Sequence, residues 1–248
     1  MLAVLIFILG LIFGSFLNAV IFRLKRNEQF IRGRSKCLSC KHNLAWQDLI
    51  PLFSFIFLRA KCRYCKAKIS WQYPAVELAT ALVFLIGYWH YLNLTDYSVY
   101  LVFSCFLIII FVFDFKYYLI LDKVSLSALM AAFVFNFLLG YSAINLLIGA
   151  LAVAGFFLLQ FVVSQGAWIG GGDLRLGLVM GAMLGWPMAL VALSLAYLSG
   201  AAAGLILIVF KKKRFNSQLP FGTFLSLATW VTLLWGEKIL SWYLNTML

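Results

Sequence analysis

The chain has 248 residues, of which 65% are hydrophobic and only 11% are charged, whereas soluble domains carry roughly 25% charged residues. This composition excludes a soluble globular protein, and at about 20 apolar residues per crossing the length accommodates roughly eight membrane spans. Twenty Lys and Arg residues against eight Asp and Glu residues give a net charge of +12. In a membrane protein this excess indicates topology first, because Lys and Arg are retained on the cytoplasmic side of the membrane. We therefore expect the lipid bilayer to be a partner of this chain and expect no nucleic-acid partner.

Uninterrupted apolar runs predict an all-α polytopic membrane protein with about eight transmembrane helices. The predicted spans are residues 2–22, 75–92, 97–115, 122–140, 142–165, 173–186, 187–210 and 220–243. The first run differs from a secretory signal, because its basic residues follow it instead of preceding it. We therefore expect a retained first helix with the N-terminus outside.

The distribution of basic residues supports this span count. If the spans alternate, the cytoplasmic segments carry twelve Lys and Arg residues in 23–73, two between the third and fourth spans, Arg175 after the fifth, and four in 211–214. Nineteen of the twenty basic residues then lie on one side, and only Lys238 lies outside. The count depends on a break at Gly185-Trp186-Pro187, because seven spans would place 211–214 on the side opposite to 23–73.

The segment 23–73 is the one stretch long and polar enough to fold outside the bilayer. Its roughly 50 residues are fewer than a domain usually needs to fold unaided, so we expect an additional crosslink within this segment. We predict three parts: a first transmembrane helix at 1–22, a cytoplasmic loop domain at 23–73, and a transmembrane helical bundle at 74–248. No internal repeat is evident.

Four of the five cysteines lie in this loop: Cys37, Cys40, Cys62 and Cys65. They form two C-x2-C knuckles separated by 21 residues, a spacing typical of zinc ribbons. Because the cytoplasm keeps thiols reduced, we predict a cytoplasmic zinc-ribbon-like loop with a structural Zn²⁺; unligated thiols or a redox pair are the alternatives. His42 is a less favoured ligand, and Cys105, within the third span, is interpreted as a packing residue.

The eight acids separate into groups. Four are interpreted as solvated surface charges: Glu28, Asp48, Asp96 and Glu237. Glu77 lies just inside the second span, where a carboxylate needs a partner or a function; a functional role and an ion pair with a loop Arg or Lys are both open. Asp122 precedes the fourth span and is predicted to be its N-cap.

Asp114 and Asp173 remain, 59 residues apart in sequence and on the same predicted face of the membrane. Asp114 ends the third span, and Asp173 follows Gly170, Gly171 and Gly172, which let the backbone bend and leave room for a peptide near the acid. Two carboxylates at one depth can share a proton and act as an aspartyl hydrolase. Two structural helix-end aspartates, or a proton or ion relay, are the alternatives.

The ordered set of motifs resembles the prepilin peptidase family, the polytopic aspartic proteases of bacterial type IV pilus, type II secretion and competence systems. The resemblance rests on Gly14-Ser-Phe-Leu-Asn18 through Arg23, the two cysteine knuckles, Tyr73-Pro-Ala-Val-Glu77, the segment from Asp114 to Asp122, Gly170-Gly-Gly-Asp173, and Pro220-Phe-Gly222. It covers nearly the entire chain. Two departures are Arg175, where the family usually has Lys, and Leu121, where it commonly has Pro.

This resemblance implies a peptidase of the bacterial inner membrane that cleaves the leader of prepilins or pseudopilins at the cytoplasmic face, after a glycine and commonly before phenylalanine. It implies that Asp114 and Asp173 are catalytic, with Glu77, Asp122 and the three glycines in supporting motifs. It also implies N-methylation of the new N-terminus with S-adenosylmethionine, although no glycine loop for a nucleotide is present. A presenilin-type intramembrane protease, a proton- or ion-coupled transporter and a zinc-containing membrane scaffold are the alternatives.

Overall fold

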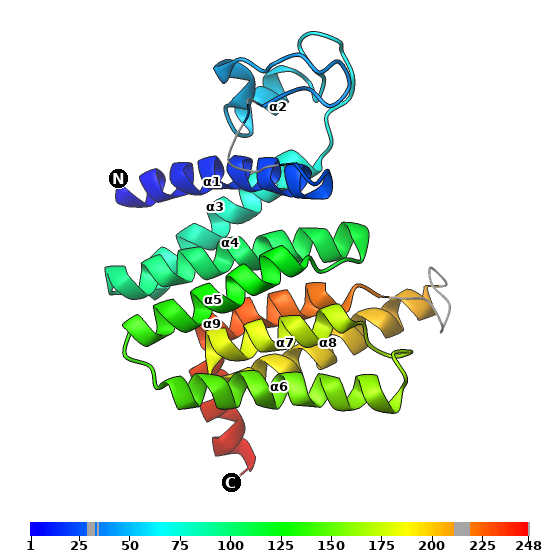
Figure 1. The fold of residues 1–248 in the computed structure, drawn as a ribbon. Coiled ribbons are helices and arrows are strands. Elements are labelled where there is room, and N and C mark those ends of the chain that lie inside the picture. The colour runs from blue at the N-terminus through cyan, green and yellow to red at the C-terminus, as the bar shows by residue number, and fades with distance from the viewer. Residues whose placement is uncertain (29–32, 34, 211–218, 248) are drawn as a thin grey trace. The chain divides into compact units, whose positions relative to one another are not determined.

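The computed structural model describes residues 1–28, 33, 35–210 and 219–247 (Figure 1). Within these residues the helices are α1 (Leu2–Lys25), the 3-10 helix η1 (Trp46–Leu49), α2 (Phe53–Phe57), α3 (Gln72–His90), α4 (Leu94–Tyr117), α5 (Asp122–Leu138), α6 (Ala143–Val163), α7 (Gly171–Leu184), α8 (Met188–Val209) and α9 (Phe221–Met247). This helical architecture confirms the predicted fold class. The basic cluster at 211–214 lies outside the described residues.

The long helices coincide with the predicted spans to within a few residues. In the described part of the chain, α1, α4, α6 and α8 are long and apolar enough to cross a membrane, so the protein is a multi-pass membrane protein; the count of eight spans stays a prediction. The break expected at Gly185 is present, because α7 ends at Leu184 and Gly185 adopts a φ of +66°, a helix-terminating conformation that suits glycine.

The chain divides into two compact units, Met1–Tyr97 and Ser98–Leu248; the predicted division at residues 22 and 73 stays a prediction. In the first unit, α1 and α3 touch through backbone atoms. A Cβ atom at Gly10 would lie 2.5 Å from Ala81 Cα, and one at Gly14 would lie 2.6 Å from Glu77 Cα. Small residues permit such close packing between membrane helices. Asn18 strengthens the pair by donating to the Tyr73 carbonyl at 3.0 Å.

In the second unit, α7 is the central helix and packs against α5, α6, α8 and α9 (Figure 1). Its contact with α6 is again made by backbone atoms, because a Cβ atom at Gly181 would lie 2.4 Å from Ala150 Cα. Asn136 of α5 donates to the carbonyl oxygens of Ala182 and Met183 at 2.8 and 3.1 Å, which satisfies acceptors at the end of α7. These contacts hold the 14-residue helix that carries Asp173.

Candidate active site and metal centre

Asp114 lies in the last turn of α4 and is buried. Its Oδ2 accepts a 2.7 Å hydrogen bond from the Thr223 amide, and the Gly222 amide also donates to this carboxylate. Both amides belong to the first turn of α9, where N–H groups have no partner within the helix and attract anions. A Cβ atom at Gly222 would lie 2.9 Å from Asp114 Cγ, so glycine is required for the carboxylate to approach α9.

Asp173 lies in the first turn of α7. Its Oδ2 accepts a 3.3 Å hydrogen bond from the amide of Gly170, the N-cap residue of the helix. The side chain interacts electrostatically with Asp114 and with Tyr197. The two predicted catalytic aspartates therefore lie close together, each held by amides at a helix N-terminus.

Ile120 connects the surroundings of the two aspartates. A Cβ atom at Gly172 would lie 3.0 Å from Ile120 Cβ, and a Cβ atom at Gly222 would lie 3.0 Å from Ile120 Cδ1. The side chain of Ile120 thus fills the space between the glycine beside Asp173 and the glycine beside Asp114. Gly171 is different, because a Cβ atom there would meet nothing within 4 Å.

Asp122 is not the N-cap of its helix, so this prediction was wrong. The N-cap is Leu121, whose extended backbone leads directly into Asp122 as the first helical residue, without a side-chain cap. The Asp122 carboxylate instead forms an exposed ion pair with Arg175. Because Arg175 follows Asp173 by two residues, the ion pair joins the start of α5 to the first turn of α7.

The four loop cysteines form one cluster. Their sulfur atoms all lie within 4.8 Å of one another, and the Cys37 and Cys65 sulfurs are 3.8 Å apart. Tetrahedral zinc with bonds of about 2.3 Å separates its sulfur ligands by about 3.8 Å, so the donor set fits zinc. Burial tends to raise the pKa of Cys37, but the amides of Cys40 and Ser39 and the neighbouring thiols outweigh it and lower the pKa to about 6. The Ala67 amide tends to lower the pKa of Cys65, but desolvation and the neighbouring thiols outweigh it and raise the pKa to about 11. The metal-free cluster therefore favours a thiolate at Cys37, and metal binding would release the remaining thiol protons.

The two knuckles are an internal repeat, contrary to the expectation from the sequence. Antiparallel bridges pair Lys36 with Asn43 in the first knuckle and Lys61 with Lys68 in the second. In each knuckle the residue after the second cysteine has a left-handed backbone, with φ +59° at Lys41 and +61° at Lys66. Both segments therefore make the same turn, which directs two sulfurs toward one point.

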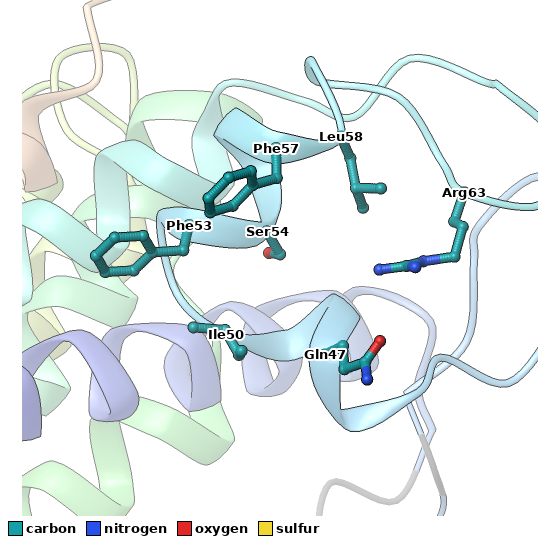
Figure 2. A pocket seen from close by; sticks show the side chains of 7 residues that line it. All are labelled: Gln47, Ile50, Phe53, Ser54, Phe57, Leu58 and Arg63. Carbon is teal, nitrogen blue, oxygen red and sulfur yellow. The ribbon is translucent and has the colours of Figure 1, made fainter.

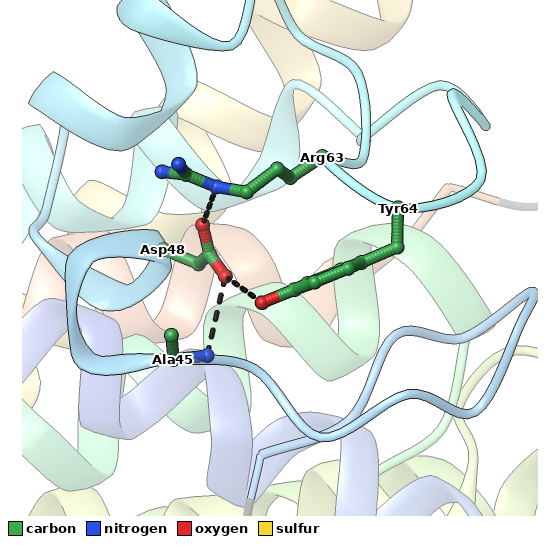
Figure 3. A network of polar contacts seen from close by, with 4 residues as sticks. All are labelled: Ala45, Asp48, Arg63 and Tyr64. Carbon is green, nitrogen blue, oxygen red and sulfur yellow. Dashed lines mark hydrogen bonds and ion pairs between the residues drawn. The ribbon is translucent and has the colours of Figure 1, made fainter.

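Asp48 is the centre of a hydrogen-bond network in the loop (Figure 3). Its interpretation as a solvated surface charge was therefore wrong. Its side chain is 3% exposed and accepts hydrogen bonds from Arg63 Nε at 2.7 Å, from Tyr64 at 3.2 Å and from the Ala45 amide at 3.2 Å. Burial would raise the pKa of Asp48, but these hydrogen bonds, led by that of Arg63, outweigh it and lower the pKa. The carboxylate thereby joins the first knuckle to the second.

Glu77 is buried in α3. Its Oε2 accepts a 2.9 Å hydrogen bond from the Leu52 amide, and Ser15 of α1 also contributes a hydrogen bond. Among the described residues its partners are therefore an amide and a hydroxyl, and no Arg or Lys pairs with it. Glu77 anchors the loop to the helix pair α1 and α3.

Comparisons with known proteins agree with both parts of this arrangement. The model of the bacterial peptidase A24 N-terminal domain matches residues 8–91, and the model of the type IV leader peptidase family matches residues 101–205. A prepilin leader peptidase/N-methyltransferase of Aeromonas salmonicida is 33% identical, over 98% of this chain and 94% of its own length. The chain belongs to the type IV leader peptidase family.

Further relatives in this family carry the same name. The protein of Pseudomonas aeruginosa is 33% identical over 96% of this chain and 92% of its own length. That of Myxococcus xanthus is 34% identical over 84% of this chain and 63% of its own length. No solved structure matches the chain.

Three features of this family member's site were not predicted from the sequence. The Thr223 amide holds Asp114, Ile120 lies between the two glycines, and Tyr197 lies near Asp173, where its hydroxyl donates to Gln160 Oε1 at 2.8 Å. The Pro220-Phe-Gly222 motif was the available signal for the first of these, because a proline before a helix often marks its first turn.

Proposed function

We propose that this chain is a membrane aspartic endopeptidase that removes the leader peptide of type IV prepilins or pseudopilins at the cytoplasmic face of the bacterial inner membrane. The observation that carries the proposal is the pair of Asp114 and Asp173, which approach each other from α4 and α7. The names of the full-length relatives supply the substrate class. Cleavage at the cytoplasmic face follows from the distribution of basic residues.

In the proposed reaction the two carboxylates share one proton. The ionised carboxylate takes a proton from a water molecule, whose oxygen attacks the carbonyl carbon of the scissile peptide bond. The neutral carboxylic acid gives its proton to the carbonyl oxygen. When the tetrahedral intermediate breaks down, the carbon–nitrogen bond is cleaved and the proton from water passes to the leaving amine. One hydroxyl of the intermediate returns a proton to the carboxylate that had protonated the carbonyl oxygen, which restores the carbonyl group and the shared proton. The amides of Thr223 and Gly170 keep the two carboxylates oriented.

We propose that Cys37, Cys40, Cys62 and Cys65 hold a structural Zn²⁺. When bound, the ion supplies a crosslink between the two knuckles, with four protein ligands and no open position for catalysis. The Asp48 network joins the same knuckles through hydrogen bonds. The loop thus has two independent connections in place of the hydrophobic core that its size cannot provide.

We propose N-methylation from the names of the relatives, and S-adenosylmethionine as the methyl donor from the family resemblance alone. Carboxylates often accept hydrogen bonds from the ribose hydroxyls of a nucleoside cofactor. In the loop and the adjoining start of α3, the buried carboxylates of Asp48 and Glu77 are already occupied by protein donors. These two carboxylates therefore do not fit the cofactor.

The test is cleavage of a prepilin with a Gly-Phe junction by the purified full-length protein, followed by mass spectrometry. We expect Asp114→Asn and Asp173→Asn each to reduce the cleavage rate by at least about 10³-fold, while Asp96→Asn, a half-buried acid at the opposite end of α4 from Asp114, leaves it unchanged. Full leader removal by either active-site variant would exclude that residue from the mechanism. Proton or ion flux without cleavage would instead support a transporter.

A further inference from the structure

The short helix α2 exposes a large apolar surface. Phe53, Ile56 and Phe57 are 58%, 69% and 81% exposed, whereas Phe55 is buried and contacts the Trp71 ring at 4.9 Å. One side of α2 therefore packs into the loop, and the other side presents two phenylalanines and an isoleucine. Exposed apolar patches of this kind mark contact with a membrane or another molecule.

The attachment of α2 places it at the depth of the membrane. Its N-cap residue, Leu52, is hydrogen bonded to Glu77, and the Glu77 Cα lies against Gly14 of α1. The first basic residue of α1, Arg23, is nine positions further along the helix, which is about 13 Å at 1.5 Å per residue. Since α1 is itself long and apolar enough to span the bilayer, α2 begins below the level of its basic end and beside the acyl chains.

This depth explains the role of Glu77. Leu52 has a left-handed backbone, with φ +59°, and its amide lies outside the regular hydrogen bonding of a helix. A backbone N–H at the depth of the acyl chains has no water as a partner and must be satisfied by the protein. The buried Glu77 carboxylate satisfies it, so the loop can enter the leaflet without an unpaired donor.

A pocket of about 360 Å³ lies beside α2 (Figure 2). Its apolar lining comes from Ile50, Phe53, Phe57 and Leu58, and its polar lining includes Gln47 and Arg63. Figure 2 shows the Arg63 guanidinium pointing into the pocket from the side opposite to the two phenylalanine rings. Asp48 binds Arg63 through Nε, and among the described residues no partner is found for the Nη atoms. The pocket thus combines an apolar wall with donors suited to a phosphate group.

The charge of the loop identifies the class of lipid. Five basic residues of the second knuckle and its approach are exposed: Arg59, Lys61, Arg63, Lys66 and Lys68. Juxtamembrane Lys and Arg residues attract anionic head groups by about 1 kcal/mol each. An apolar helix face flanked by such residues is typical of segments that lie in the membrane interface.

We propose that α2 is a lipid-embedded element, in which Phe53, Ile56 and Phe57 insert between phospholipids of the leaflet bordering the loop and Arg63 binds the phosphate of an anionic phospholipid. This contact goes beyond the proposed peptidase function and does not depend on it. It seats the zinc-ribbon-like loop against the bilayer.

The first test uses the full-length protein in nanodiscs of phosphatidylcholine and phosphatidylglycerol. The photoreactive residue p-benzoylphenylalanine replaces Phe57 or, as a matched control, the exposed Ser39 at the tip of the first knuckle. After illumination, mass spectrometry should find phospholipid attached to α2 in several-fold higher yield than to the first knuckle. Equal yields at both positions, or crosslinks from position 57 to protein only, would overturn the proposal, and crosslinks to an added prepilin would identify a protein-docking surface instead.

The second test measures lipid that co-purifies with the protein. Phe53→Ser combined with Phe57→Ser should lower the bound phosphatidylglycerol several-fold, whereas Leu92→Ser, a fully exposed leucine beyond the far end of α3, should not change it. Resistance of the loop to limited proteolysis serves as the measure of loop folding. A double variant that keeps this resistance and its phosphatidylglycerol would contradict the proposal; one that loses the resistance is replaced by Ile56→Ser, for which the same two outcomes apply.

Discussion

At the residue scale, the geometry of the site depends on glycines, which have no side chain to occupy the space around the aspartates. Gly172 and Gly222 leave room for Ile120, and Gly222 also lets Asp114 reach the amides of α9. A methyl group at either glycine would have to displace Ile120 or Asp114, whose positions are fixed by surrounding helices. Catalytic rates are sensitive to such displacements, because a shift of about 1 Å can cost about 10²-fold in rate.

This predicts different effects for two neighbouring glycines. Gly172→Ala should reduce the rate of leader cleavage measurably but by less than the roughly 10²-fold that a 1 Å displacement can cost, because its Cβ would lie 3.0 Å from Ile120 Cβ and would require Ile120 to shift. Gly171→Ala should fold equally well and retain most activity, because its Cβ would meet nothing within 4 Å. Cleavage rates and thermal unfolding of both variants test this, and a larger loss for Gly171→Ala than for Gly172→Ala would contradict the assignment.

At the element scale, the site is formed where helix ends meet. Asp114 ends α4 and contacts the start of α9, while Asp173 and Arg175 lie in the first turn of α7, and Arg175 contacts the start of α5. The Arg175 and Asp122 side chains are 47% and 72% exposed. Solvent therefore screens the ion pair, and pairs of this kind contribute roughly 0–1 kcal/mol.

We expect this ion pair to position α7 and to add little to stability. Arg175→Lys should retain the wild-type rate of leader cleavage, because the charge is kept. Arg175→Gln should reduce this rate a few-fold. A double-mutant cycle of Arg175→Gln with Asp122→Asn should give a coupling energy in thermal or denaturant unfolding below about 1 kcal/mol, decreasing with salt. A coupling energy that is well above this value and independent of salt would disagree with an exposed pair.

The zinc-ribbon-like loop is a second element with its own prediction. Elemental analysis of the purified chain should give one zinc per molecule, and Cys37→Ser or Cys62→Ser should reduce it strongly. Cys105→Ser should keep the metal, because Cys105 lies in α4 outside the cluster. Since the described contacts of both aspartates lie within Ser98–Leu248, the variants without zinc should keep a cleavage kcat within a few-fold of the wild type. Absence of zinc from the unaltered protein, or loss of kcat as complete as in Asp114→Asn, would be inconsistent with this role.

The helices and the cysteine cluster were predictable from the sequence because their signals are local. Apolar runs located the long helices, and the C-x2-C spacing located the cysteine cluster. The partners of Asp114 and Asp48 were not predictable in this way. Nothing near position 114 indicates that the amide of Thr223, 109 residues later, will face it, and one acid among many basic residues resembles a surface charge until Arg63 and Tyr64 are seen to enclose it.

At the scale of the whole molecule, the unequal distribution of basic residues is the main indication of how the protein is oriented in the membrane. It predicts that the connection between α5 and α6 lies outside and the connection between α6 and α7 lies in the cytoplasm. Tyr141 and Ala167 are exposed residues on either side of α6. They therefore provide a matched pair of positions for measuring orientation.

In intact cells, a membrane-impermeant maleimide should label Tyr141→Cys in a Cys105→Ser background. It should label Ala167→Cys only after the membrane is permeabilised. The Cys105→Ser protein without an added cysteine reports the background labelling of the four cysteines of the loop. The opposite pattern, or equal labelling of both positions in intact cells, would reverse or remove the proposed cytoplasmic placement of the site.

We propose that Asp114 and Asp173 act as one catalytic unit. The most direct measurement compares prepilin cleavage rates of the two single Asp→Asn variants with that of the double variant, since residues that act as a unit are strongly non-additive. We expect each single variant and the double variant to have the same residual rate, at least about 10³-fold below wild type. Losses that multiply in the double variant, or substantial activity in either single variant, would contradict it.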